Sequence, residues 1–110
     1  MPVRGRTVTE ADVAMFAGLT GDFHPQHTDA EWAASSPFGE RIAHGLLVLS
    51  LAAGLVDFDP EEVIALRRVR DVVFKRPVRL GDTIRVSAEM GEPAPTGIAS
   101  VTLRITVADT

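Results

Sequence analysis

The feature that most constrains this chain is a long apolar stretch near its middle, over residues 42–56. Apolar side chains fill almost every position of it, so a helix formed here has no face suited to water. Such a helix has to be enclosed on most sides by the rest of the domain. The stretch is too short to cross a bilayer, which takes about 20 apolar residues. We therefore expect a buried central helix in a protein that does not associate with membranes.

The sequence after this stretch has the character of a β-sheet. Val, Ile and Thr are frequent there, apolar and polar residues partly alternate, and Gly81-Asp82 and residues 93–97 supply turn signals. The pattern predicts four strands, over residues 63–70, 72–80, 83–90 and 99–108. Residues 3–8 are a candidate for a further short strand.

The sequence before the apolar stretch predicts short helices. Thr9 and Asp12 resemble a capping box that opens a helix over residues 10–19. Thr28 and Glu31 form a second pair of this kind, for a helix that ends before Pro37. An antiparallel sheet wrapped around one central apolar helix satisfies both halves of the chain, so the predicted fold class is α+β.

Length and composition narrow the class of protein further. The 110 residues suffice for one domain, and a domain this small encloses no deep pocket for a large cofactor by itself, so we expect a partner subunit. The net charge of −4 argues against a nucleic-acid binder, whose affinity depends on basic surfaces. The chain has no Cys, which excludes disulfides and thiolate catalysis. With no apolar secretory signal at the N-terminus, these features predict a cytoplasmic protein.

A polar loop between the first two predicted helices carries the strongest candidates for chemistry. Asp22 is followed closely by His24 and His27, and Gly21 and Pro25 constrain the chain around them. A carboxylate and an imidazole held close together can share proton transfers. Two other interpretations stay open: a turn capped by Asp22 with both histidines on the surface, or a metal site. A metal is the weaker of these, because this His-x-x-His spacing is interrupted by proline and does not place both rings on one helical face.

Two further features admit both a functional and a structural interpretation. His44-Gly45 opens the apolar helix, where unpaired N–H groups attract negative charge and a glycine lets a substrate approach closely. Gly45 is equally explained by tight packing. Six basic side chains over residues 67–79 suit either a phosphate group or a solvated strand face. Signatures of α/β-hydrolases, P-loop proteins and dinucleotide-binding proteins are absent from the sequence.

Three segments of the chain resemble the MaoC-like dehydratases, which include the (R)-specific enoyl-CoA hydratases. They are FAGLTGDFHPQHTD at residues 16–29, RIAHGLL at residues 41–47 and VFKRPVRLGDT at residues 73–83. The similarity covers residues 5–108 and implies a hotdog fold, a curved antiparallel sheet around a long helix. It also implies a homodimer, or a hetero-oligomer with another hotdog subunit.

The resemblance implies reversible hydration of a trans-2-enoyl thioester carried by CoA or an acyl-carrier protein, with no metal or other cofactor. Asp22 and His27 occupy the family's catalytic positions, and Gly45 occupies the position whose backbone N–H contacts the thioester oxygen. Five neighbouring residues are predicted to contact substrate: Phe23, His24, Pro25, His44 and Ser50.

The sequence departs from the family pattern in two places. His24 stands where the motif usually has Asn, and the chain ends at Thr110, where the family continues into one more strand. We therefore expect residues 1–110 to form a single hotdog domain that lacks the last strand. The second departure keeps an alternative open, a non-catalytic or half-catalytic subunit of a hetero-oligomeric dehydratase. A hotdog thioesterase is a third possibility.

Overall fold

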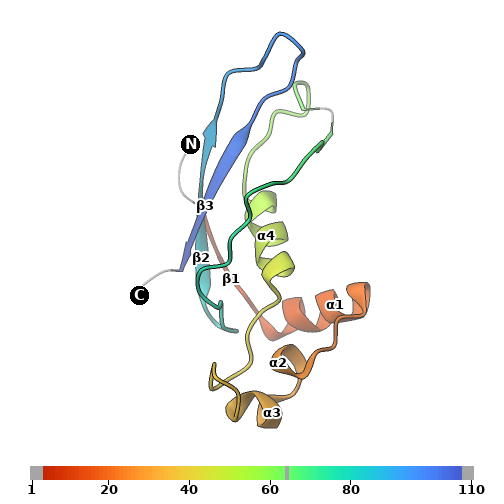
Figure 1. Cartoon of the computed structure of the whole chain (residues 1–110), viewed down its shortest axis with the longest axis vertical. Helices are drawn as coiled ribbons and strands as arrows, with labels where there is room; N and C mark the ends of the chain where they lie inside the picture. Colours follow the sequence, from red (N-terminus) through yellow and green to blue (C-terminus); the bar gives the residue numbers. More distant parts are fainter. Residues whose placement is uncertain (1–3, 64, 108–110) are drawn as a thin grey trace.

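The computed structural model of the protein describes residues 4–63 and 65–107. Its helices and strands follow one another in the order β1 (Arg4–Thr7), α1 (Glu10–Thr20), α2 (Pro25–Thr28), α3 (Ala30–Ala34), α4 (Gly45–Gly54), β2 (Thr83–Met90) and β3 (Val101–Val107). Figure 1 shows the strands on one side of α4 and the three short helices gathered at one end of the molecule. None of the described helices is long and apolar enough to cross a membrane.

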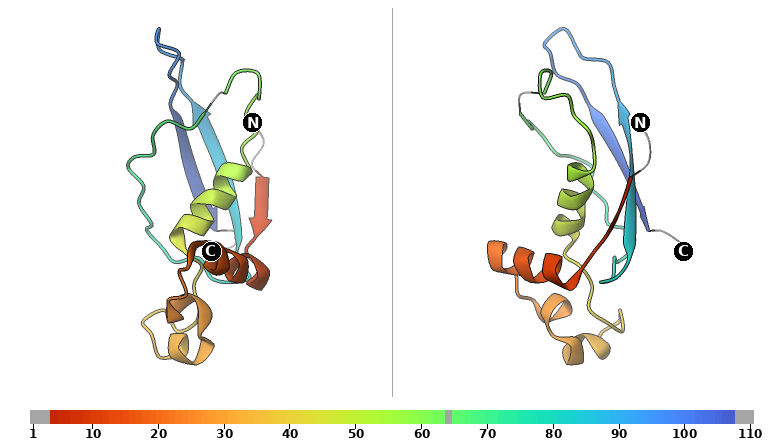
Figure 2. Two further views of the ribbon diagram at one scale, coloured as in Figure 1. Left: turned by 90° about the vertical axis from the view of Figure 1, so that its right-hand side faces the viewer. Right: turned by 180° about the vertical axis from the view of Figure 1, so that it is seen from behind.

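The sheet is antiparallel and has the order β1-β2-β3. Alternate residues of β2 point toward α4, so Ile84 and Val86 are buried while Arg85 between them is exposed. Figure 2 shows α4 lying across one face of the sheet. The core is made of apolar residues from β2, α1, α4 and the segments next to β1 and α4: Val8, Val13, Ala43, Leu47, Val48, Ala52, Leu55, Val56, Ile84 and Val86. The sheet packed on an apolar helix confirms the predicted α+β class.

The central helix begins at Gly45, as expected from His44-Gly45 at its start, and so leaves out the first residues of the apolar stretch. The residues just before it are extended: Ile42 pairs with Arg79 in an isolated β-bridge, and the Ala43 N–H donates to the Val78 carbonyl at 2.7 Å. An apolar run does not show where a helix starts when a neighbouring segment offers backbone hydrogen bonds to its first residues.

The first helix confirms its predicted capping box. The Thr9 hydroxyl accepts from the Asp12 N–H, and the Asp12 carboxylate accepts from the Thr9 N–H. The second predicted cap is wrong by one residue. Asp29 caps α3 by accepting from the Trp32 N–H, whereas the Thr28 hydroxyl donates to the Phe23 carbonyl.

Two of the four predicted strands are absent from the described residues. The segment of residues 65–75 is extended and exposed, and its backbone forms no hydrogen bond with another described residue, so the strands predicted at 63–70 and 72–80 are wrong. Ile64 lies outside the described residues. A β-strand needs a neighbour for its N–H and C=O groups, and this segment lies apart from the sheet (Figure 2).

The other two predicted strands form β2 and β3. The predicted N-terminal strand is confirmed as β1, while Val3 and Ala108, at the predicted strand ends, lie outside the described residues.

Candidate active site

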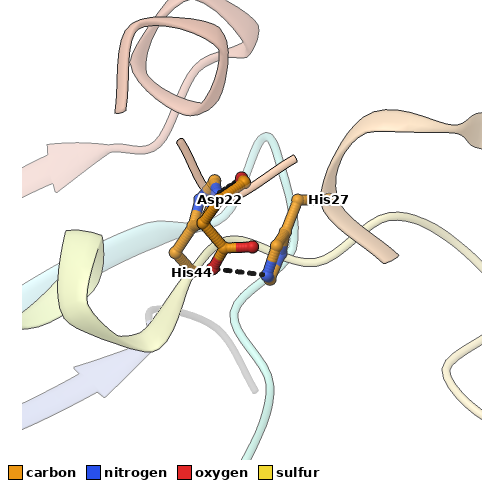
Figure 3. A group of neighbouring side chains, drawn as sticks. All are labelled: Asp22, His27 and His44. Atoms are coloured by element: carbon orange, nitrogen blue, oxygen red, sulfur yellow. Dashed lines mark hydrogen bonds and ion pairs between the residues drawn. The ribbon is translucent and has the colours of Figure 1, made fainter. Parts of the chain in front are cut away.

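The loop after α1 orients the Asp22 carboxylate by local hydrogen bonds. Gly21 ends α1 in the left-handed region, with φ of 83°, which glycine adopts without strain. The His24 N–H then donates to Asp22 Oδ1 at 3.2 Å, the pattern of a turn closed by an aspartate side chain. Oδ2 of Asp22 makes no such bond and points toward His27 (Figure 3). The Asp22 side chain is 51% exposed, so solvent reaches the carboxylate.

His24 caps the next short helix. Its Nδ1 accepts from the Gln26 N–H at 3.0 Å, and Pro25 occupies the first turn of α2. The ring packs edge-on against Trp32, with centroids 5.4 Å apart. His24 is thus an exposed capping residue, and its accepting nitrogen does here what the side-chain oxygen of Asn does at a helix start.

His27 is held as a base. The ring is 5% exposed, and its Nδ1 lies 2.8 Å from the Ile42 carbonyl oxygen. Because a carbonyl only accepts, Nδ1 carries the proton and the neutral ring keeps its lone pair on Nε2. That Nε2 lies 3.9 Å from Asp22 Oδ2. Burial lowers the pKa of His27 below 6.5, and the Ile42 bond and the Asp22 charge only partly oppose it.

His44 lies directly beside this pair. It is 2% exposed, its Nε2 lies 3.0 Å from the Asp22 backbone carbonyl, and its ring stacks on His27 with centroids 3.8 Å apart and planes 24° apart. Phe16 of α1 packs against it as well, at 4.9 Å. The structure therefore brings together residues that lie more than 15 positions apart in the chain, as Figure 3 shows.

Asp22, His27 and His44 each offer a ligand atom within 4.8 Å of the others, so a shared metal ion has to be considered. The lone pairs of an imidazole lie in the plane of its ring, and two nearly parallel stacked rings do not aim them at one point. Nε2 of His44 is also engaged with a carbonyl. His24, the third histidine of the predicted metal set, is not part of this cluster. The arrangement favours proton transfer over metal binding.

Gly45 begins α4 next to this cluster. Its N–H belongs to the first turn, which has no partner within the helix, and His44 provides no side-chain cap. A Cβ on Gly45 would lie 3.0–3.1 Å from the ring of Phe74, so the ring would have to move by a few tenths of an ångström. The packing interpretation of Gly45 therefore has direct support, and it does not conflict with a role for the N–H.

The residue spacing in the sequence does not mark Phe74 as a neighbour of the site. Phe74 belongs to the extended segment that was predicted to be a strand, and its ring covers the start of α4 although it is half exposed. Only the three-dimensional contact with Gly45 identifies it. In the sequence, Phe74 differs from its neighbours only as an aromatic residue in a basic segment, which does not point to Gly45.

The remaining predicted residues differ in their relation to the cluster. A pocket of about 170 Å³ between α1 and α2 has Phe23 and His27 in its wall and the Arg41–Glu10 ion pair at its edge. Ser50 is exposed on α4, and its hydroxyl donates to the Leu46 carbonyl of the same helix. The basic residues of 67–76 are exposed and line neither the cluster nor this pocket.

Comparison with known proteins gives consistent results. A family model described as MaoC like domain matches residues 2–108. An (R)-specific enoyl-CoA hydratase of Aeromonas caviae is 37% identical over 98 residues, which cover 86% of this chain and 72% of the relative. Protein MaoC of Klebsiella aerogenes is 49% identical over 82 residues, covering 74% of this chain and 24% of the relative. A 3-hydroxybutyryl-CoA dehydratase of Methylorubrum extorquens is 36% identical over 90 residues, which cover 82% of this chain and 57% of the relative.

Solved structures agree with the sequence relatives. The (R)-hydratase from A. caviae superposes with a TM-score of 0.82 at 32% identity, covering 96% of this chain and 81% of that one. A structure described as a monoamine oxidase regulatory protein from Archaeoglobus gives a TM-score of 0.84 at 43% identity. The superposition covers 96% of this chain and 75% of that one. The matched part of the chain spans 24% of the length of the Klebsiella relative and 57% of the length of the Methylorubrum relative.

Proposed function

This chain belongs to the MaoC-like domain family and has its hotdog fold, and from that premise we propose that it catalyses the reversible hydration of a trans-2-enoyl thioester to a 3-hydroxyacyl thioester. The observation that carries the proposal is the meeting of the Asp22 carboxylate with the basic nitrogen of His27 beside the start of α4, which has no side-chain cap. The names of the relatives support it, since they are hydratases and dehydratases of acyl thioesters.

The spacing of the pair suits a water molecule. Asp22 Oδ2 and His27 Nε2 are 3.9 Å apart, which is too far for a direct hydrogen bond. A water placed to one side of the line that joins them reaches both at about 2.8 Å. Because a carboxylate oxygen accepts hydrogen bonds and His27 keeps a lone pair on Nε2, both atoms accept hydrogen bonds from that water.

In the proposed step this water attacks Cβ of the enoyl group. An O–H bond of water breaks, a C–O bond forms at Cβ, and the π electrons move through Cα to the thioester oxygen. The Asp22–His27 pair holds the proton that water loses and returns it to Cα as the carbonyl re-forms. The pair ends in its starting state, and no change of oxidation state requires a redox cofactor. General acid–base assistance of this kind contributes about 10²–10⁴-fold.

The Gly45 N–H is the proposed donor to the thioester oxygen. Negative charge develops on that oxygen in the enolate-like intermediate, and the first N–H groups of a helix attract such charge. Gly45 lies at the first position of α4 and His44 leaves that turn uncapped. Phe23, His24 and Pro25 come from the same loop as Asp22 and are proposed to contact the substrate, together with Ser50 further along α4.

We propose CoA or an acyl-carrier protein as the thiol part of the substrate, and the exposed basic residues of 67–76 as contacts for its phosphates. We also propose that the protein works as a homodimer or as a hetero-oligomer with another hotdog subunit, in the cytoplasm. The support is a set of exposed apolar side chains on the extended segment and next to it: Val63, Leu66, Val69, Val72, Val73 and Phe74. Such a patch is typical of surfaces that another chain covers.

The test is a spectrophotometric assay of purified protein with trans-2-enoyl-CoA substrates of four to twelve carbons, in which hydration removes the absorbance of the conjugated thioester. The molar mass in solution is measured on the same sample by light scattering. Hydration by a homodimer supports the proposal. Activity that appears only after a second hotdog subunit is added would instead show a half-catalytic subunit, and release of free thiol without hydration would show a thioesterase. No change with any of these substrates overturns the proposed activity.

A further inference from the structure

His44 has a place in the fold that its side chain does not use in the ordinary way. It stands at the N-cap position of α4, where Ser, Thr, Asp and Asn commonly accept a hydrogen bond from the first turn. The His44 side chain makes no such bond. It is buried instead between α1 and α2, against Phe16 and His27. The first N–H groups of α4 therefore have no side-chain cap at the point where the substrate oxygen is proposed to bind.

The side chain of His44 makes a hydrogen bond to the backbone of Asp22. Its Nε2 lies 3.0 Å from the backbone carbonyl of Asp22, and since the carbonyl only accepts, Nε2 is the donor. This bond joins the start of α4 to the loop after α1. It fixes the main chain of Asp22 relative to Gly45, the residue that directly follows His44.

The ring of His44 also limits the movement of His27. The two rings stack with centroids 3.8 Å apart, and His27 Nδ1 is bonded to the Ile42 carbonyl. A ring held by one edge and covered on one face cannot swing away from Asp22 without losing both contacts. The two histidines carry their protons on opposite nitrogens, Nδ1 in His27 and Nε2 in His44.

We propose that His44 is a positioning residue, which holds Asp22 through its backbone and His27 through ring stacking so that carboxylate, imidazole and the Gly45 N–H act on one substrate. This replaces the substrate contact expected from the sequence. Two observations favour it: His44 is 2% exposed, and the nitrogen best placed to bond is already used inside the protein. Its other nitrogen, Nδ1, is buried without a partner in the described residues. The kinetic part of the inference depends on the proposed function.

Two substitutions separate the two contacts. His44→Phe keeps a ring that stacks on His27 but loses the donor to the Asp22 carbonyl. His44→Gln loses the ring but keeps an amide N–H at about the position of Nε2. We expect kcat of His44→Phe to fall about 100-fold, as for other displacements of reacting groups, with KM within about threefold of wild type. His44→Gln should keep at least about a tenth of the wild-type kcat, because its amide N–H can still donate to the Asp22 carbonyl.

The kinetic outcomes that overturn the proposal are specific. A rise in KM with unchanged kcat in both variants would mean that His44 binds substrate. Equal losses of kcat in both variants, matched by equal losses of Tm, would mean that His44 only fills space in the core. Unchanged kinetics in both would mean that it has no role in the site.

A measurement on the wild-type protein without substrate makes the test independent of activity and of variant folding. Long-range ¹H–¹⁵N NMR spectra distinguish the two neutral tautomers of each of the three histidines, and a His24→Gln and a His27→Gln sample together assign all three signals. We expect the Nε2–H form for His44 and the Nδ1–H form for His27. The opposite tautomer at His44 would mean that Nε2 does not donate to the Asp22 carbonyl, and this overturns the proposal. If wild type hydrates no thioester, the proposed function fails, and these tautomers still decide whether His44 holds Asp22.

Discussion

Two segments without long regular structure behave in opposite ways in this protein. Residues 21–29 form the loop and single helical turn that carry the candidate site, and residues 65–75 form the extended segment on the other side of α4. The first is tied down by side chains that bond to the backbone two to five residues away, as in the Asp22–His24, His24–Gln26 and Thr28–Phe23 contacts. The second has no backbone hydrogen bond to any described residue.

The difference shows which sequence signals determine local structure without contacts from the rest of the fold. Gly, Asp and Pro close turns with atoms that lie within a few residues, so the loop needs little from the rest of the fold. The β-branched residues of the extended segment favour strands only when a neighbouring strand is present. The segment touches the site at one place, where Phe74 covers Gly45.

The largest expected effect comes from removing one charge in the ordered loop. Asp22→Asn keeps an oxygen that accepts from the His24 N–H, so the loop should keep its shape, but it loses the carboxylate proposed to bind water. We expect kcat for enoyl-CoA hydration to fall about 10²–10⁴-fold, with Tm almost unchanged.

Asp29→Asn is the matched control for this charge. It lies in the same stretch and its Asn can still accept from the Trp32 N–H, so activity should stay within about twofold. If Asp22→Asn and Asp29→Asn have the same rate, the carboxylate of Asp22 has no special role.

The contrast between core and extended segment can be measured on two leucines. Leu47 on α4 is 5% exposed and Leu66 is 82% exposed. Leu47→Ala should lower the free energy of unfolding by about 2–5 kcal/mol, and Leu66→Ala by less than about 0.5 kcal/mol. The measurement is urea unfolding at a protein concentration where light scattering reports a monomer. A loss above about 2 kcal/mol for Leu66→Ala would show that the monomer buries this segment.

The contact between the extended segment and the start of α4 can be tested at Gly45. A Cβ there meets the Phe74 ring at 3.0–3.1 Å, so the ring has to shift and Gly45→Ala should destabilise the protein by about 1–3 kcal/mol. Phe74→Ala removes the obstacle, and the double variant should recover most of that loss relative to Phe74→Ala alone. The kcat of the double variant then reports on the site itself. An additive loss of stability would show that the glycine is needed for another reason.

The smallest effect is a pH dependence that arises from the buried His27. Burial lowers its pKa in the folded protein below 6.5, so the folded state binds fewer protons than the unfolded state just below that pH. The stabilisation is complete above pH 6.5 and is lost as pH falls toward the lower folded pKa. The slope contributed by one such group is at most about 1.4 kcal/mol per pH unit.

His27→Gln provides the comparison for this slope, because it removes the titrating group from the same buried position. Urea unfolding at pH 7.5, 6.5 and 5.5 should show a steeper fall for wild type than for His27→Gln. Parallel lines for the two proteins would mean that His27 has the same pKa in the folded and unfolded states.

Several parts of the fold and site followed from the sequence, for one physical reason. The α1 capping box, the turn at Gly81 and the strands β2 and β3 depend on contacts close in the chain or on a strong local pattern. The apolar helix formed as predicted, but the expectation that it is enclosed on most sides is wrong for the described residues, because Leu46, Ser50 and Ala53 are exposed. The closeness of Asp22 and His27 also followed from their place on one stiff loop, whereas their assignment as the reacting pair came from the family resemblance.

Only the tertiary structure decided the rest. It placed His44 on His27 and against the Asp22 carbonyl, Phe74 on Gly45, and Ile42 opposite Arg79. It also decided that two β-prone stretches have no strand partner in the described part of the chain. These features join residues far apart in sequence, and their energies depend on what the folded chain places beside each residue, which no local pattern records.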